Sequence, residues 1–282
     1  MTTLAVDIGG TKIEVGIVDD FGSILVRRRA ATPGSGLADL IVALCVDVRS
    51  EAAAQFIDAP GRVGVGCGGP MAGARGEVSP LNIPEWRGFR LRDHLRTSLG
   101  LEVVVDNDAK ALALAEGWLG AAQGERNYLA MVVSTGVGAG IVVDGQLLDG
   151  ADGNAGHLGH LMVDSDGPRC ACGSVGCLES LASGLSIEAA TGRPAAEASA
   201  GLRRQTGTLV GRAVAQAVVL LDLRLALVGG SVALGFGAPF FEAANAELQR
   251  CARIEYASGA RIEPVGLGSD APLVGAAAVA RG

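Results

Sequence analysis

The segment Leu4–Asp20, LAVDIGGTKIEVGIVDD, places a carboxylate, two glycines, a threonine and a lysine between apolar runs. The backbone N–H groups of a glycine-rich turn can approach a phosphate closely, and the Thr hydroxyl and Lys ammonium add donors and charge. Asp7 would repel that phosphate unless a cation lies between them, as Mg2+ does in nucleotide sites, often through its waters. The segment therefore predicts half of a Mg–nucleotide clamp, although a plain hairpin explains the glycines equally well.

A second glycine-rich turn, STGVGAG, also lies between apolar runs. Aligning the two segments places Thr11 on Thr135 and Gly16 on Gly140, whereas Asp7 has no acidic counterpart. The match suggests a duplicated α/β unit whose second turn supplies the other half of the clamp. Chance is the alternative, because Gly-Ile-Val strings are common in such strands.

The string GVGCGG fits the dinucleotide pattern G-x-G-x-x-G at Gly64, Gly66 and Gly69. Pro70 follows at once, where the helix of a dinucleotide site should begin. Neither glycine turn described above fits the Walker A pattern G-x-x-x-x-G-K-[ST]. We therefore interpret Gly69 as part of a substrate loop, and an NAD(P)-dependent oxidoreductase is the weaker alternative.

Asp106, Asn107 and Asp108 stand where a predicted strand, LEVVVDND, gives way to a helix, AKALALAEGWLG. Ligands bind at such carboxyl ends of strands in open α/β sheets. Asp108 is the candidate base that orients and deprotonates a hydroxyl nucleophile in phosphoryl transfer. Helix capping by Asn107 or Asp108 is the structural alternative, and Asp106 is expected to face elsewhere or to cap.

Three cysteines lie within CACGSVGC, just after His160. Three thiolates and one imidazole complete a tetrahedral structural zinc site, for which the predicted ligands are His160, Cys170, Cys172 and Cys177. Such a closed site has no open position for a catalytic water, so its task would be to fix the loop that carries His157 and Glu179. A redox or disulfide pair is the alternative.

The elements that must position these groups alternate between strands and helices, which indicates an α/β fold with a mixed sheet. The predicted strands include 4–8, 12–18, 23–29, 62–67, 101–108, 224–228 and 261–265, and the predicted helices include 36–56, 91–100, 109–120, 178–190, 207–222, 241–254 and 271–280. Gly100 is a predicted C-cap.

The composition describes a globular chain of 282 residues with 49% hydrophobic residues and 43 glycines. A net charge of −7 argues against a general nucleic-acid or anionic-membrane surface. The most apolar late stretch, 213–228, is interrupted by charges and predicts a buried helix running into a strand, not a membrane span. A strand begins almost at the N-terminus, so we expect no signal peptide and a cytoplasmic location. Cys45, Cys67 and Cys251 are expected to be buried free thiols.

Taken together and in this order, DIGGTK, DNDAKALALAEG, STGVGAGIVVDG, GNAGHLGH and CACGSVGCLE resemble the ROK family (repressors, open reading frames and sugar kinases). The resemblance covers essentially the whole chain. It implies an actin-like ATPase (ribonuclease H-like) fold with two α/β domains around a cleft, usually in a homodimer or higher homo-oligomer. The small domain would span 1–109, with a C-terminal helix of about 271–282 packing back on it, and the large domain 110–270, with the zinc loop at 160–177.

The resemblance also implies a glucokinase-like enzyme that transfers the γ-phosphate of ATP to a hexose hydroxyl, most often O6. Asp108 matches the catalytic base of the family. The implied sugar contacts are Gly69, Asn82, Asn107, Asp108, His157, His160 and Glu179. The implied nucleotide contacts are Asp7, Gly9, Gly10, Thr11 and Lys12 in the first turn, Thr135 and Gly136 in the second, and Gly229 and Gly230 near adenosine.

Two positions depart from the family pattern. His157 stands where the family's sugar kinases have a Glu that accepts hydrogen bonds from sugar hydroxyls, and a neutral His has one acceptor nitrogen. The substrate is therefore open between glucose, mannose, fructose and N-acetylmannosamine, and a catalytically weak sugar-binding protein is the further alternative. Lys110 stands where the family usually has Asn, and we expect it to face solvent unless it pairs with an acid or attracts a phosphorylated ligand.

The same family resemblance implies a phosphate donor and bears on nucleic-acid binding. ATP is the expected donor, with polyphosphate open. The phosphate motif starts at Asp7, so we expect no DNA-binding domain of the kind that the family's repressors carry.

Overall fold

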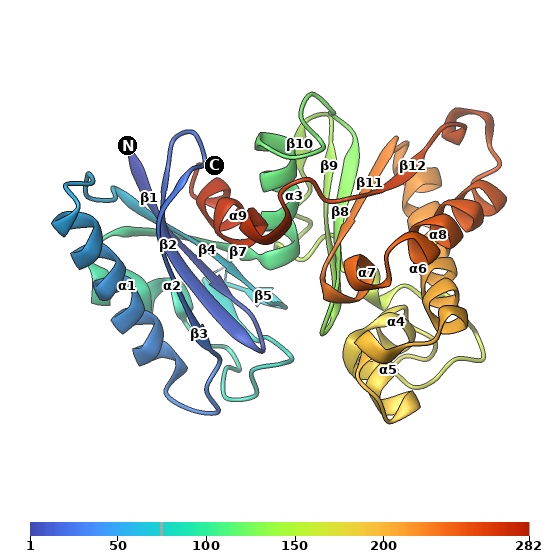
Figure 1. Ribbon diagram of the computed structural model, residues 1–282, viewed down its shortest axis with the longest axis horizontal. Helices are drawn as coiled ribbons and strands as arrows, with labels where there is room; N and C mark the ends of the chain where they lie inside the picture. Colours follow the sequence, from blue (N-terminus) through green and yellow to red (C-terminus); the bar gives the residue numbers. More distant parts are fainter. Residues whose placement is uncertain (74–75, 282) are drawn as a thin grey trace. The chain divides into compact units, whose positions relative to one another are not determined.

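The computed structural model describes residues 1–73 and 76–281, and the chain forms two compact units (Figure 1). Unit 1 comprises 1–119, 149–155 and 267–282, of which Gly282 lies outside the described residues. Unit 2 comprises 120–148 and 156–266. The domain limits expected from the sequence stay a prediction, and each unit is described by itself below.

Unit 1 is built on a five-stranded sheet in the order β3-β2-β1-β4-β7. The strands are β1 (Thr2–Ile8), β2 (Lys12–Asp19), β3 (Ile24–Ala31), β4 (Arg62–Cys67) and β7 (Glu102–Asn107). β1, β2 and β3 pair antiparallel, whereas β4 pairs parallel with both β1 and β7. The parallel strands therefore end at one edge of the sheet, where Asn107 leads into a helix.

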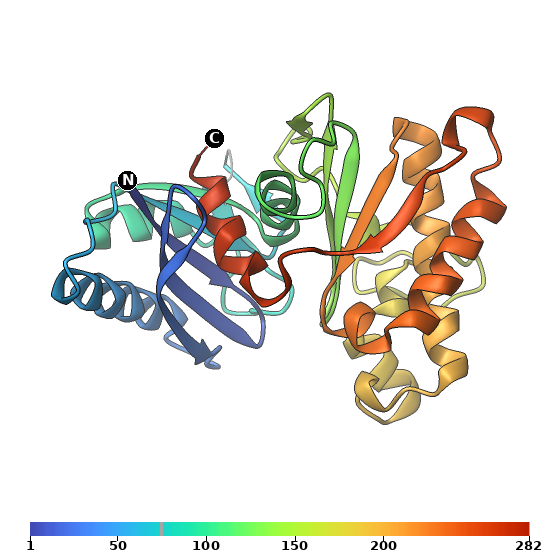
Figure 2. The same cartoon turned by 45° about the horizontal axis from the view of Figure 1, so that its top comes forward.

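Helices cover both faces of this sheet. Leu4 and Val6 belong to the core that includes residues of α1 (Leu37–Ala54) and α2 (Leu91–Leu99). Ala5 faces the other way and packs with Leu273 of α9 (Ala271–Val279). Figure 2 shows α1 and α9 on opposite sides of the sheet.

Glycine in β4 permits the close approach of α9. A Cβ on Gly64 would collide with the carbonyl group of Ala276, so a larger residue would push the helix away from the sheet. α9 also contacts α3 (Asp108–Trp118), which follows β7 directly. The helix that begins at Asp108 is thus supported by the last helix of the chain. The predicted C-cap is confirmed, since Gly100 ends α2 at φ 67.

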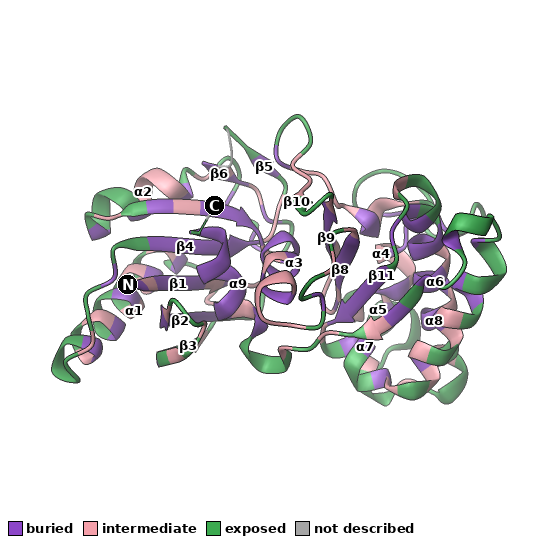
Figure 3. Cartoon of the chain, turned by 90° about the horizontal axis from the view of Figure 1, so that it is seen from above, coloured by how far each residue is buried: buried purple, intermediate pink, exposed green. Residues whose placement is uncertain are grey.

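Unit 2 repeats the plan with a sheet in the order β10-β9-β8-β11-β12. The strands are β8 (Tyr128–Val133), β9 (Val137–Val143), β10 (Gln146–Leu147), β11 (Leu225–Gly229) and β12 (Arg261–Pro264). β8, β9 and β10 pair antiparallel, and β11 pairs parallel with β8 and β12. Most residues of β8 and β11 are buried (Figure 3).

The longest helix pair of unit 2 is α6 (Ala200–Leu221) with α8 (Ala238–Cys251). Gly207 and Gly211 of α6 face the backbone of α8 so closely that a Cβ at either position would collide with it. The predicted helix over 178–190 is split at Ser183, whose hydroxyl caps the second half. α6 begins earlier than expected because Ser199 caps it.

Shorter elements complete both units. They are β5 (Met71–Ala72), β6 (Glu77–Val78), α4 (Glu179–Ala182), α5 (Gly184–Thr191), α7 (Ser231–Phe236), and the 3-10 turns η1 (Leu158–His160), η2 (Ala195–Glu197), η3 (Glu255–Ala257) and η4 (Gly268–Asp270). Within the described residues, no helix combines the length and apolarity that crossing a bilayer requires. The apolar stretch 213–228 is the end of α6 followed by β11, as predicted.

Candidate active site

The carboxyl ends of three neighbouring strands in unit 1 place acids around a glycine. Asp7 of β1 pairs in register with Gly66 of β4, and Gly66 pairs with Asp106 of β7. A Cβ on Gly66 would lie 3.6 Å from Asp7 Oδ1 and 3.6 Å from the Cα of Asp108. Asp7 and Asp108 therefore flank Gly66, and the missing side chain leaves space between them.

Burial disfavours ionisation of both carboxyls, and repulsion adds to this effect at Asp7. Burial, then the charges of Asp108 and Glu14, raise the pKa of Asp7 to about 7. Burial also raises the pKa of Asp108. Two neighbouring acids that resist ionisation are suited to bind a cation, and a carboxyl with a raised pKa is suited to accept a proton near neutral pH.

Asn107, a predicted sugar contact, also caps the helix that follows it. Its side-chain oxygen accepts from the Ala109 N–H at 3.0 Å and caps α3. Asp108 Oδ1 accepts from the same N–H at 2.9 Å. The capping alternative is therefore confirmed for Asn107, and the caps hold the Asp108 carboxyl at the start of its helix.

The first glycine turn is a hairpin that stands next to a predicted sugar contact. Gly9 N donates to Lys12 O at 2.9 Å, and the Thr32 N–H donates to the carbonyl of Thr11 at 3.0 Å. A Cβ on Gly10 would lie 2.6 Å from Cβ of Asn82, so a larger residue would displace Asn82. The turn and Asn82 thus depend on each other for position. Gly69 lies between β4 and β5.

Lys12 is not held by the turn alone. Its ammonium lies 2.6 Å from Oε1 of Glu14. The Glu14 side chain is fully buried, and its Oε2 lies 3.0 Å from Nε of Arg29. The sequence reasoning missed Glu14. Its signal was an acid between Ile13 and Val15, in a strand with no other charged residue between its two ends. A phosphate bound at Lys12, as predicted, would share the ammonium with this carboxylate.

Lys110 does not face solvent, so that expectation is wrong. Its side chain is 1% exposed, and its ammonium lies 2.7 Å from Oδ1 of Asp149 and 3.3 Å from Oδ1 of Asp106. The pairing alternative is therefore the one observed. Asp106, which was expected to cap or face elsewhere, is buried in this ion pair.

Unit 2 gathers the second turn and the predicted adenosine loop. Ser134 N donates to Gly136 O at 2.9 Å, which closes the turn around Thr135. Gly230 has φ 94, and a Cβ there would collide with the carbonyl of Val133, so glycine is required. Gly229 pairs in register with the β8 strand that leads into the turn.

A serine pair, which the sequence reasoning missed, joins these two loops. The hydroxyls of Ser134 and Ser231 lie 2.9 Å apart. Ser134 adjoins Thr135 and Ser231 adjoins Gly230, and both neighbours were singled out, so proximity in the sequence was the available signal.

Glu179 connects the cysteine loop to the second turn. Its Oε2 accepts from the Val137 N–H at 2.8 Å, and Glu179 begins α4 two residues after Cys177. His157 precedes η1, and its ring centroid lies 6.1 Å from that of His160. Both histidines are partly exposed. Unit 2 therefore places all three predicted sugar contacts of its own near the cysteine loop.

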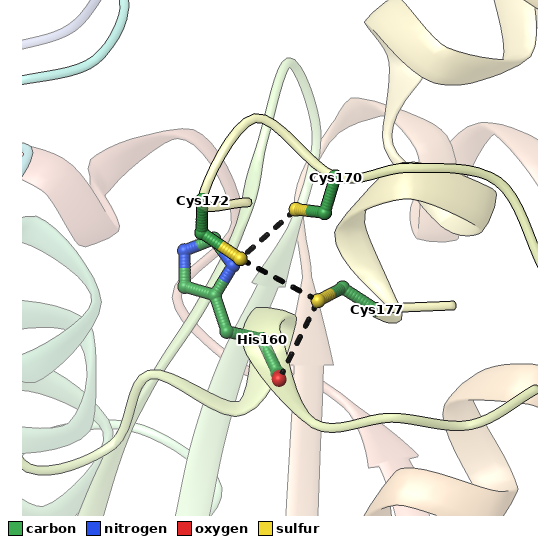
Figure 4. A group of neighbouring side chains, drawn as sticks. All are labelled: His160, Cys170, Cys172 and Cys177. Atoms are coloured by element: carbon green, nitrogen blue, oxygen red, sulfur yellow. Dashed lines mark hydrogen bonds between the residues drawn. The ribbon is translucent and has the colours of Figure 1, made fainter. Parts of the chain in front are cut away.

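The four predicted metal ligands converge (Figure 4). The ligand atoms of His160, Cys170, Cys172 and Cys177 all lie within 4.8 Å of one another. Cys172 Sγ lies 3.7 Å from Cys177 Sγ, and Cys170 Sγ lies 3.7 Å from His160 Nδ1. A tetrahedral zinc with Zn–S bonds of ~2.3 Å needs sulfur atoms about 3.8 Å apart, whereas a disulfide needs ~2.05 Å. The geometry fits a metal, and no disulfide is formed among these cysteines.

The structure also shows the burial of the other cysteines and the location of the GVGCGG string. Cys45 and Cys67 are buried free thiols, as expected, but Cys251 is exposed, so that expectation is wrong. Gly64 and Gly66 lie within β4 and face a helix and the acid pair, so they do not form a dinucleotide loop.

Comparison with known proteins identifies the family. The sequence profile of the ROK family matches residues 3–282. An N-acetylmannosamine kinase from Salmonella arizonae is 37% identical over an alignment of 303 positions, which covers 100% of this chain and 99% of the relative. A ROK family glucokinase from Streptomyces griseus, solved with glucose and AMPPNP, is 33% identical with a TM-score of 0.86 and covers 100% of this chain and 99% of that one.

A ROK hexokinase from Thermus thermophilus is 33% identical with a TM-score of 0.81, covering 99% of this chain and 97% of that one. The predicted α/β fold of the actin-like ATPase class is therefore confirmed. The predicted site residues remain predictions, as does the cleft. The chain belongs to the ROK family.

Proposed function

We propose that this protein is an ATP-dependent kinase that phosphorylates the O6 hydroxyl of a hexose or N-acylhexosamine. As a ROK family member whose relatives are named sugar kinases, the chain is a sugar kinase, and the substrate is the finer part of the proposal. The observation that carries it is the placement of Asp7 and Asp108 on either side of Gly66, at the strand ends beside the first glycine turn.

Asp108 accepts the proton of the sugar hydroxyl as its oxygen attacks the γ-phosphate in line. The raised pKa of Asp108 suits a base that must take up a proton. The amides of the glycine turns, with Lys12 and Thr11, hold the phosphates and stabilise the charge that develops on them. Ser134 and Ser231 fix the second turn against the adenosine loop.

The acids of unit 1 fit a magnesium ion, because Asp7 and Asp108 offer oxygen ligands and their charges repel each other without a cation. A bound Mg2+ would neutralise charge on the phosphate oxygens. Asp7 is the residue that would hold it, through water.

N-acetylmannosamine is the substrate that we favour, with glucose as the competitor. A relative that carries this name is 37% identical across the chain. The departure at His157 agrees with it, since an imidazole N–H can donate to an amide carbonyl, which a glutamate cannot do. Glucose offers hydroxyls in place of that carbonyl.

The cysteine loop binds a structural zinc in this proposal. His160 Nδ1 and three thiolates saturate the metal, so zinc would fix the segment that carries Glu179 and His157. We also propose that the enzyme is a cytoplasmic homodimer, as the family resemblance implies. Analytical ultracentrifugation of the purified chain checks the dimer.

A coupled ADP-release assay over glucose, mannose, fructose and N-acetylmannosamine tests the function. Turnover is expected, with the highest kcat/KM for N-acetylmannosamine. His157→Glu should raise the ratio of glucose to N-acetylmannosamine kcat/KM by about tenfold or more. Clear sugar binding without turnover on any sugar would instead establish the catalytically weak alternative. Replacing ATP by polyphosphate, with sugar phosphate formation as the readout, identifies the donor.

A further inference from the structure

A buried lysine in unit 1 has no task in the reaction described above. Lys110 is among the largest fully buried side chains of the described residues. Its ammonium donates to Asp149 Oδ1 at 2.7 Å and to the carbonyl of Gly153 at 3.2 Å, and lies 3.3 Å from Asp106 Oδ1. An ammonium has three N–H donors, so these oxygens satisfy all of them.

Two of the three partners belong to one loop. Asp106 lies in β7, next to the helix of Lys110, whereas Asp149 and Gly153 belong to the loop 149–155. This loop is part of unit 1, although the chain on both sides of it belongs to unit 2. The Ala155 N–H donates to the carbonyl of Asp149 at 2.9 Å and closes the loop on itself.

The other end of the loop is held on a different element. Asn154 Nδ2 donates to the carbonyl of Met71 at 2.9 Å, and the Met71 N–H donates to Asn154 Oδ1 at 2.8 Å. The Asn154 side chain thus makes the two hydrogen bonds to Met71 that a residue of a neighbouring β-strand would make. Met71 begins β5, two residues after Gly69 of the predicted sugar loop.

The loop 149–155 therefore connects two parts of the predicted site. One anchor is Lys110, two residues past the proposed base Asp108 on α3, and the other is the strand that follows Gly69. A loop with both ends fixed restricts how far its two anchors can move relative to each other, because each bond removes freedom from the connecting backbone.

We propose that Lys110 and Asn154 are positioning residues, which use the loop 149–155 to hold the predicted sugar loop at Gly69 in place relative to Asp108. The inference rests on the proposed function for its kinetic readout. It predicts that loosening either anchor weakens sugar use, leaves ATP use intact, and leaves the global fold intact.

Asp149→Asn and Asn154→Ala test the two anchors. Asp106 remains as the counter-ion of Lys110, so the first change leaves no isolated buried charge. Each variant should lower kcat/KM for the sugar by about 10- to 100-fold, because small misplacements of reacting groups are costly, with KM for ATP within about twofold. The loss of sugar kcat/KM in the double variant, expressed as a free energy, should be smaller than the sum of the two single losses, since both changes release the same loop.

Asp152→Asn is the matched control. It makes the same charge change in the same loop, and Asp152 is exposed. Its sugar kinetics should equal those of the wild type. Lys110→Met alone leaves Asp106 buried without its ammonium, so Lys110→Met is made together with Asp106→Asn and should reproduce the sugar defect of Asp149→Asn.

Hydrogen exchange separates this proposal from the proposed function. Amides of 149–155 should exchange faster in Asp149→Asn and Asn154→Ala than in Asp152→Asn, whether or not the protein turns over a sugar, and calorimetry then gives sugar affinity without turnover. Unchanged exchange, or faster exchange with unchanged sugar affinity and kinetics, overturns the inference. A parallel loss in ATP kinetics and thermal stability also overturns it, because that result describes a purely structural ion pair.

Discussion

The hairpin β1–β2 of unit 1 and the hairpin β8–β9 of unit 2 share a scaffold but not a chemistry. Leu4 pairs with Ile17 in the first, and Leu129 pairs with Ile141 in the second. The next pairs are Ala5 with Gly16 and Ala130 with Gly140. Both sheets continue with two parallel strands in the same order. These matches support the duplication that the sequence alignment suggested.

The two hairpins diverge toward their turns. Asp7 pairs with Glu14 in unit 1, whereas the corresponding pair in unit 2 is Val132 with Gly138. The strand next to each also places a glycine there, Gly66 in β4 and Gly229 in β11. On this common framework, unit 1 thus carries charged side chains near its turn, whereas unit 2 contributes amides, hydroxyls and the cysteine loop. The following predictions test this division.

The largest effect is expected at the proposed base. Asp108→Asn should lower kcat by about 10³-fold with sugar affinity largely kept, because the amide cannot accept the proton. Asp222→Asn, at the C-cap of α6 in unit 2, makes the same charge change and should leave kcat unaltered. Coupled kinetics and calorimetry measure both variants. Near-normal turnover in Asp108→Asn contradicts the assignment.

The cysteine loop should carry the metal-dependent stability of unit 2. Cys172→Ser should abolish a zinc content of about one per chain, and lower the free energy of unfolding by about 3 kcal/mol, or Tm by ~6–12 °C. The exposed Cys251 provides the control, and Cys251→Ser should change stability by less than about 0.5 kcal/mol. Elemental analysis and thermal unfolding are the measurements. A zinc-free wild type with full activity would refute the site.

The two corresponding glycines should respond differently to one added methyl group. In Gly66→Ala the Cβ meets ordinary contacts of 3.5–3.6 Å, so stability is kept, but the methyl enters the space between Asp7 and Asp108. Activity should fall by about tenfold or more. In Gly229→Ala the Cβ lies 2.9 Å from the side chain of Val265, so stability falls by about 1 kcal/mol. Equal responses in activity and unfolding would remove the contrast between the units.

The last expected effect is a pH dependence of stability that arises in unit 1. Asp7 has a folded pKa of about 7, above the ordinary value of 3.8, so between these pH values the folded state binds more protons than the unfolded state. Stability of the metal-free protein should therefore fall as pH rises through that window. Asp7→Asn cannot titrate, so its stability advantage over the wild type should grow, by on the order of 1–3 kcal/mol between pH 5 and 7.

Urea unfolding of both proteins at each pH gives this difference, in which effects of pH elsewhere in the chain cancel. Millimolar Mg2+ at neutral pH should reduce the advantage, because a cation favours the ionised Asp7. A difference that stays constant with pH would show that Asp7 titrates normally.

Local patterns in the sequence were sufficient for most elements. Glycine turns, β-branched strands and the capped start of α3 depend on neighbours in the chain, so the hairpins, Gly100 and Asn107 were predictable. The cysteine cluster was predictable for the same reason, since Cys170, Cys172 and Cys177 lie close together in sequence as well as in space.

The misses come from long-range partners. Lys110 was expected in solvent because its partner Asp149 is distant in sequence, and α3 is buried on nearly all sides between β4, β7 and α9. Glu14 needed Arg29 from the neighbouring strand, which only the register of the sheet reveals. Cys251 was expected inside because its surroundings are apolar, but it lies on the exposed side of the last turn of α8.

The covering of Gly64 by α9 has a consequence for biosynthesis. The sheet of unit 1 is translated first, yet the helix that covers one of its faces is among the last segments made. At typical translation rates the 148 residues from Leu119 to Leu267 take roughly 7–30 s to appear. During that interval Ala5 and Val18 lack the helix that covers them in the folded protein, so apolar surface of this half stays exposed on the nascent chain.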